Sequence, residues 1–157
     1  MIAVLQRVFE ATVYADGIKS GNIRRGLYIL LGVEKTDSER DADVLAEKIS
    51  KLRIFSDENG KMNLSVKDID GEVMVVSNFT LNANYSHGNR PDYLQSASPD
   101  VANKLYEYFV SLMRSKVRLV ETGVFGADMK TNMSTDGPVT IVMHSSVLTG
   151  GKNDTSH

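Results

Sequence analysis

The first 33 residues carry the pattern that most restricts the fold. Apolar and β-branched residues recur along IAVLQRVFEATVYA, which is typical of a half-buried strand. The Asp16-Gly17 pair follows at once, and this pair favours the tight turn of a β-hairpin. A short apolar run, GLYILLGV, then predicts a further buried strand. The chain is therefore expected to begin as a set of strands.

The hydrophobic period changes after this β-rich segment. Apolar residues recur at helical spacing over about 38–55, and either Asp37 or Ser38 suits the N-cap position. Ser98, Pro99 and Asp100 predict the start of a second helix, because a polar N-cap, a first-turn proline and an acidic first turn occur together. Two main helices are expected.

The segments around these helices complete the expected fold. GEVMVVSNFTLNA predicts a central strand buried on both faces, and two late strands are expected near 117–122 and 129–143. NYSHGNRPDYLQSASPD predicts a long irregular loop. Strands and helices without regular alternation predict an α+β fold with a mostly antiparallel or mixed sheet. We expect one domain over 1–149 and a polar tail over 150–157.

Composition excludes several classes of protein. The chain has no cysteine, which excludes a disulfide scaffold, a thiolate metal site and a cysteine nucleophile. Its net charge is −2, whereas proteins that grip long nucleic acid through its phosphates are usually basic on one face, so any bound nucleic acid is expected to have a small footprint. Arg7 and Glu10 interrupt the first apolar run, so we expect neither a signal peptide nor a membrane span. The prediction is a cytoplasmic protein without a membrane or DNA partner.

The usual catalytic and metal-binding patterns are not found. His87, His144 and His157 are far apart and no metal-ligand spacing occurs, so we expect neither a metal nor another cofactor. Ser77 and Thr80 lie at the end of the predicted central strand, but a hydroxyl nucleophile needs a base within hydrogen-bond reach. Residues in such positions are more often hydrogen-bond partners at a strand end.

A backbone site is the alternative that these residues leave open. The amides of the turn at Phe79 and Thr80 can form an oxyanion hole without a side-chain nucleophile.

Five further residues can be interpreted from the sequence alone. Arg7 lies inside a predicted strand, where it either faces solvent, the commoner outcome, or is held by a carboxylate or carbonyl groups. Phe125 and Met129 are core residues on composition alone. Gly137 and Pro138 precede a β-branched segment, and proline in a strand is confined to edges, first residues and bulges. This pair is either a turn that opens a strand or a backbone shaped for a function.

Seven stretches, taken together, resemble one protein family. In chain order they are MIAVLQRV, LRIFSDENGKMNLSV, VVSNFTL, HGNRPDY, LYEYFV, TGVFGADM and DGPVT. This set, from residue 1 to about 143, resembles the D-aminoacyl-tRNA deacylases. The resemblance implies a homodimeric, cytoplasmic, metal-free esterase with a barrel-like core. Such enzymes hydrolyse the ester between a D-amino acid and the 3′ end of tRNA, and also glycine mischarged onto alanine tRNA.

The resemblance also implies a means of selecting chirality. In the family a Gly-cis-Pro segment projects from one subunit into the pocket of the other. The matching segment here is Thr135–Thr140, so Gly137 and Pro138 are implied as a chirality filter, a pair whose backbone carbonyls exclude the side chain of an L-amino acid. Arg7 is implied to help hold this element from the partner's side.

The remaining site residues are implied in the same way. Ser77–Leu81 matches the family's second site segment, which includes Ser77 and Asn78. The backbone amides of Phe79 and Thr80 match those that receive the ester carbonyl. Phe125 and Met129 match positions that contact the terminal adenine.

A substrate-assisted mechanism is our hypothesis for such a site. The ester lies beside the ribose 2′-hydroxyl, and a group positioned on the substrate has a large effective concentration. We expect this hydroxyl to assist the attacking water while protein amides stabilise the oxyanion.

Two positions depart from the family's pattern. Asn78 stands where the family usually has Gln, and Thr135 stands where it usually has Asn. A related branch with Thr at this second position has a trans proline and accepts an L-amino acid. The neighbouring PVT and FTL residues match the D-specific branch, so D-specificity is expected. The alternatives are a deacylase with relaxed chirality and a non-catalytic module that binds the aminoacyl end of tRNA.

Overall fold

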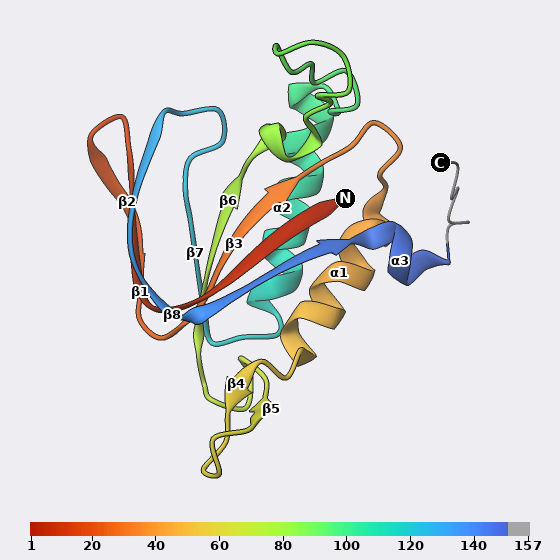
Figure 1. The fold of residues 1–157 in the computed structure, drawn as a ribbon. Coiled ribbons are helices and arrows are strands. Elements are labelled where there is room, and N and C mark those ends of the chain that lie inside the picture. Colours follow the sequence, from red (N-terminus) through yellow and green to blue (C-terminus); the bar gives the residue numbers. More distant parts are fainter. Residues whose placement is uncertain (151–157) are drawn as a thin grey trace.

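A computed structural model describes residues 1–150 as an α+β fold (Figure 1). The strands are β1 (Ile2–Ala15), β2 (Ile18–Ile23), β3 (Gly26–Gly32), β4 (Phe55–Ser56), β5 (Met62–Leu64), β6 (Glu72–Ser77), β7 (Leu119–Thr122) and β8 (Met129–His144). The helices are α1 (Glu39–Lys51), the 3₁₀ helix η1 (Phe79–Asn82), α2 (Pro99–Arg114) and the short α3 (Ser145–Thr149). Residues 151–157 of the predicted tail lie outside this description.

The main sheet is mixed and nearly closes into a barrel, as predicted. Its strand order is β2-β1-β3-β6-β7, and β8 pairs with β1. The long β1 pairs with β3 through its first half, with β2 at its end, and with β8 along its other edge. The Ser20 hydroxyl donates to the Thr122 carbonyl at 3.0 Å, which links β2 to β7 across the remaining gap.

The two parallel strand pairs explain where the helices lie. β3–β6 and β6–β7 are parallel, so each pair needs a crossover, and α1 and α2 provide them. Both helices cover the same face of the sheet (Figure 1). Leu27, Ile29 and Leu31 of β3 pack in the core on this face, whereas Tyr28 and Leu30 belong to a smaller cluster on the other face.

Several local predictions are confirmed. Asp16 and Gly17 both have positive φ, 48° and 80°, as a hairpin turn of this type requires. Ser38 is the N-cap of α1, and its amide donates to the Asp41 carboxylate at 2.9 Å. Pro99 begins α2 as expected. None of the helices within residues 1–150 is long and apolar enough to cross a membrane.

Two predicted boundaries are wrong. The first helix ends at Lys51 rather than near residue 55, because Leu52 turns to extended backbone and Phe55 pairs with Leu64 in a small hairpin. The predicted central strand ends at Ser77, because the Asn78 side chain caps a 3₁₀ turn there.

Candidate functional site

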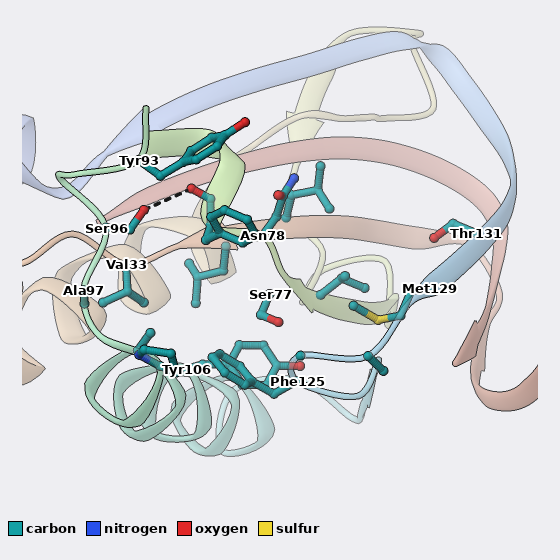
Figure 2. A pocket seen from close by; sticks show the side chains of 18 of the residues that line it. Val33, Ser77, Asn78, Tyr93, Ser96, Ala97, Tyr106, Phe125, Met129 and Thr131 are labelled. Atoms are coloured by element: carbon teal, nitrogen blue, oxygen red, sulfur yellow. Dashed lines mark hydrogen bonds between the residues drawn. The ribbon is translucent and has the colours of Figure 1, made fainter. Parts of the chain in front are cut away.

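A cavity of about 730 Å³ opens where β6 ends, between the start of α2 and the connection from β7 to β8 (Figure 2). Its lining residues are Tyr28, Leu30, Leu31, Val33, Val76, Ser77, Asn78, Phe79, Tyr93, Ser96, Ala97, Pro99, Ala102, Tyr106, Phe125, Gly126, Ala127, Met129 and Thr131. Most of these residues are apolar or aromatic, as is usual for a small-molecule site. The cavity thus contains Ser77, Asn78, Phe79, Phe125 and Met129 of the predicted site.

Asn78 organises the turn that follows β6. Its side-chain oxygen accepts a hydrogen bond from the Thr80 amide at 3.1 Å and another from the Thr80 hydroxyl at 2.5 Å. Within residues 1–150 no acceptor is bonded to the amide of Phe79. The two amides predicted to form an oxyanion hole therefore differ, because the Thr80 amide donates to Asn78 whereas the Phe79 amide has no such bond. The short Asn side chain suits this local cap.

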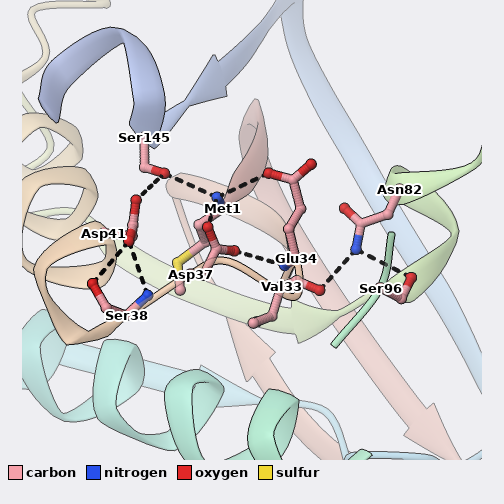
Figure 3. Close-up of polar contacts among 9 residues, drawn as sticks. All are labelled: Met1, Val33, Glu34, Asp37, Ser38, Asp41, Asn82, Ser96 and Ser145. Atoms are coloured by element: carbon pink, nitrogen blue, oxygen red, sulfur yellow. Dashed lines mark hydrogen bonds and ion pairs between the residues drawn. The ribbon is translucent and has the colours of Figure 1, made fainter. Parts of the chain in front are cut away.

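A second set of contacts holds the other side of the same turn. The Ser96 hydroxyl donates to the Phe79 carbonyl at 3.3 Å and accepts from the Asn82 side-chain amide at 3.2 Å (Figures 2 and 3). Asn82 also donates to the Val33 carbonyl at 2.8 Å, so this relay is anchored in the chain that leaves β3. The peptide that joins Phe79 to Thr80 is thus fixed through both its carbonyl and its amide.

Aromatic residues form two walls of the cavity. The Phe79 ring meets the Tyr93 ring edge-on, with centroids 5.0 Å apart. The centroids of the Phe125 ring and the buried Tyr106 ring are 6.0 Å apart. The Tyr106 hydroxyl donates to the Val75 carbonyl at 2.8 Å, and burial raises the pKa of this phenol to about 12.

The Gly137–Pro138 segment lies apart from the cavity lining of its own chain. β1 has one residue, Arg7, opposite four residues of β8, 136–139, because Gln6 pairs with Thr140 and Val8 with Thr135. The segment is therefore a bulge, with both the glycine and the proline exposed and the bond between them cis. Gly137 has a φ of 141°, and an added Cβ there would lie 2.5 Å from the amide nitrogen of Val139.

Arg7 is buried, so the expectation of a solvent-facing side chain is wrong. Its guanidinium donates to the Asp136 carbonyl at 3.2 Å and to the Asp136 carboxylate at 3.1 Å. It also donates to the Ile54 carbonyl at 2.7 Å. These contacts are all made within one chain, where the resemblance implied a contact from the partner. A contact between subunits at Arg7 stays a prediction.

The other predicted residues do not join the cavity. Thr80 is exposed beside it, and His87 and His144 lie outside its lining. No cluster of metal-ligating side chains that could hold an ion occurs within residues 1–150.

Sequence reasoning missed Tyr28, Tyr93, Ser96, Tyr106 and Thr131, all of which line the cavity. One signal was available for Tyr28, since a residue with a polar tip interrupts the apolar GLYILLGV run.

Comparisons with known proteins identify relatives over almost the whole chain. The family described as "D-Tyr-tRNA(Tyr) deacylase" matches residues 4–144. A relative from Geobacter metallireducens, named "D-aminoacyl-tRNA deacylase", is 52% identical over 151 residues, which cover 96% of this chain and 100% of that protein. A relative of the same name from Flavobacterium johnsoniae is 51% identical over 146 residues, which cover 92% and 97% of the two chains.

Two solved structures share the fold. One, titled "c-Myc DNA Unwinding Element Binding Protein", has a TM-score of 0.87 and 37% sequence identity, and the match covers 92% of this chain and 98% of that chain. The other, titled "Structural Analysis of a probable eukaryotic D-amino acid tRNA deacylase", has a TM-score of 0.76 at 14% identity. The second match covers 90% of this chain and 97% of that chain and concerns the fold alone.

Proposed function

This chain belongs to the D-Tyr-tRNA(Tyr) deacylase family, and from that membership we propose that it hydrolyses D-aminoacyl-tRNA. The reaction cleaves the ester between the amino acid and the terminal ribose, releasing a free D-amino acid and tRNA. Glycine esters are further substrates, because glycine has no side chain for a steric filter to reject. We place the reaction in the cytoplasm, where it removes D-amino acids before translation uses them.

The observation that carries this proposal is the cavity itself. It holds the Phe79 turn and the Phe125 and Met129 side chains in one apolar space (Figure 2). An aminoacyl-adenosine has an ester to be polarised at one part and a flat base to be packed at another. We therefore place the adenine against Phe125 and Met129 and the ester carbonyl at the turn.

The turn supplies the electrostatic part of the mechanism. Water attacks the ester carbonyl carbon, and the developing oxyanion accepts a hydrogen bond from the Phe79 amide. The Thr80 amide becomes a second donor if Asn78 releases it. The ribose 2′-hydroxyl assists the attacking water, and the 3′-oxygen takes the proton as the ester bond breaks. In this mechanism neither Thr80 nor Ser77 forms a covalent intermediate.

Chirality is selected by a second copy of the chain. We propose that Gly137 and Pro138 of one subunit enter the cavity of the other, and that their carbonyls leave no room for an L side chain. Two features support this arrangement: the pair is exposed on a bulge, and it lines no part of its own chain's cavity. Phe9 and Val142, which are 55% and 59% exposed on the neighbouring strands, provide apolar surface for a homodimer.

The deciding experiment follows the loss of D-Tyr-tRNA, L-Tyr-tRNA and Gly-tRNA in parallel, with a chelator present. The proposal predicts rapid loss of the D-tyrosyl and glycyl esters while the L-tyrosyl ester persists. Loss of the L ester as well would indicate relaxed chirality, with Thr135 as the first position to change. Stable esters together with tight binding of a D-aminoacyl-adenosine analogue would indicate a binding module instead.

A single substitution tests the mechanism. Thr80→Ala is expected to retain turnover within about tenfold, because only a hydroxyl and its bond to Asn78 are lost. A loss of several orders of magnitude would instead make Thr80 the nucleophile.

A further inference from the structure

One pair of polar side chains lies at the Met129 end of the cavity. The Tyr28 hydroxyl and the Thr131 hydroxyl are 2.9 Å apart and hydrogen-bonded. Both residues line the cavity, and their apolar neighbours there include Val76 and Met129. Figure 2 shows Thr131 beside Met129 at one end of the space and Tyr93 and Ser96 at the other.

Two hydroxyls bonded to each other keep unused hydrogen-bonding capacity. One hydrogen is shared between Tyr28 and Thr131, so the second hydrogen and several lone pairs stay available. Burial raises the pKa of the Tyr28 phenol, so this group is neutral and carries its proton near pH 7. The pair can therefore offer one donor and one acceptor side by side.

The position of the Tyr28–Thr131 pair determines which part of the substrate it can contact. Thr131 follows Met129 by two residues on β8, so both side chains point to the same face of the strand. Met129 is a residue that the proposed function places against the terminal adenine. The 6-amino group of adenine is a donor and the adjacent ring nitrogen is an acceptor, which complements the hydroxyl pair.

We propose that Tyr28 and Thr131 bind the 6-amino edge of the terminal adenine and so contribute to recognition of the tRNA end. This inference rests on the proposed function, because it uses the same cavity for the same adenosine. If the pair only joined β3 to β8, it would stabilise the protein without contacting the adenine.

The first test changes the ligand and leaves the protein intact. Two non-hydrolysable amides are compared by calorimetry: D-tyrosine linked to 3′-amino-3′-deoxyadenosine, and the same compound built on purine riboside, which lacks the 6-amino group. Wild-type protein is expected to bind the adenosine compound about tenfold more tightly, as one to two hydrogen bonds predict. Equal affinities for the two compounds would overturn the inference.

The second test joins the ligand change to the protein change. Tyr28→Phe removes one hydroxyl and keeps the ring, and it is expected to bring the two affinities within about threefold of each other. Thr131→Val should act in the same way, and Thr131→Ser should restore the preference. Tyr85→Phe, which removes a hydroxyl from an 81% exposed side chain, is the matched control. A tenfold preference that survives in Tyr28→Phe and Thr131→Val would overturn the inference.

The result can be separated from the proposed function. If the wild-type protein hydrolyses D-Tyr-tRNA but binds the adenosine and purine riboside compounds equally well, only the proposed contact with the base is refuted. Preference for the 6-amino group without hydrolysis would support the base contact and refute the enzymatic proposal. A fall in thermal stability of Tyr28→Phe with an unchanged tenfold preference would assign the pair a structural role only.

Discussion

The cavity and the Gly137–Pro138 bulge are built in opposite ways. The cavity is concave, and side chains from β3, β6, α2 and β8 line it. The bulge is convex, and it presents backbone atoms, with its shape fixed by one buried arginine and by a glycine that no other residue replaces without strain. Side chains define the shape of the cavity, whereas backbone atoms define the shape of the bulge.

This difference fits the two separate tasks that we propose for the two regions. A side-chain-lined space suits binding of the adenosine and polarisation of the ester, and a rigid backbone wall suits rejection of the wrong enantiomer. The Gly137–Pro138 bulge does not line the cavity of its own chain. A single chain therefore contains both regions but does not bring them together. The following substitutions are designed to break or sharpen this comparison.

The largest effect is expected for Arg7→Met. This change leaves the Asp136 carboxylate, 17% exposed, without its partner and removes the support of the bulge. The free energy of unfolding should fall by about 3 kcal/mol, measured by urea denaturation. Met at the exposed Arg40 should change it by less than about 0.5 kcal/mol. Adding Asp136→Asn should recover part of the loss; an Arg7 variant as stable as wild type would show that the bulge is held by other contacts.

Gly137→Ala is expected to have the next largest effect, on activity. An added Cβ lies 2.5 Å from the Val139 amide nitrogen, so the bulge must shift and the substrate loses its alignment. The value of kcat/KM for D-Tyr-tRNA should fall about 100-fold. Gly60→Ala is the matched control, since Gly60 also has a positive φ, 75°, but has open space around it. Equal losses in both variants would remove the special role of the bulge.

Ser96→Ala tests the cavity side of the comparison. Without this hydroxyl the Phe79 carbonyl loses its bond, so residue Phe79 is held less firmly and its own amide, the proposed oxyanion donor, is less well oriented. The value of kcat should fall about tenfold with KM nearly unchanged, because an oriented donor acts mainly on the transition state. Ser96→Thr should restore turnover, and Ser86→Ala in the exposed loop should have no effect. A rise in KM alone would instead indicate a role in binding.

The smallest effect is expected on acid stability, far from both regions. Hydrogen bonds from Lys116 and Lys51 lower the pKa of the exposed Glu47 carboxylate to about 2. A lowered folded-state pKa stabilises the protein above the unfolded value of 4.5, and this contribution is lost as the pH falls towards 2. Glu47→Gln should therefore flatten the pH dependence of stability slightly between these limits while catalysis stays unchanged. A steeper acid limb in the variant would contradict the assignment.

Local features of the fold could be predicted from the sequence, because their causes are local. The Asp16-Gly17 turn and the Ser38 and Pro99 helix starts depend on residues within one turn of each other. The Asn78 cap is also local, because an Asn side chain commonly accepts a hydrogen bond from the backbone amide two residues later.

The parts of the site that could not be predicted depend on distant residues. Arg7 can be buried because its guanidinium forms an ion pair with the carboxylate of Asp136, which lies 129 positions away in the sequence. Tyr28 and Thr131 meet across the barrel from β3 and β8, which are not paired with each other. Apolar periodicity places each of these residues on a strand but says nothing about which strand lies opposite.

The most direct test of a site shared between two chains is complementation. Ala127→Trp fills the cavity and Gly137→Ala disturbs the bulge, so homodimers of either variant should hydrolyse D-Tyr-tRNA poorly. Mixed dimers, isolated with two different affinity tags, contain one intact cavity facing one intact bulge. The account predicts that they recover about half of the wild-type rate, since one of two symmetric sites is whole. Mixed dimers as inactive as both parents would show that the cavity and the bulge do not meet across subunits.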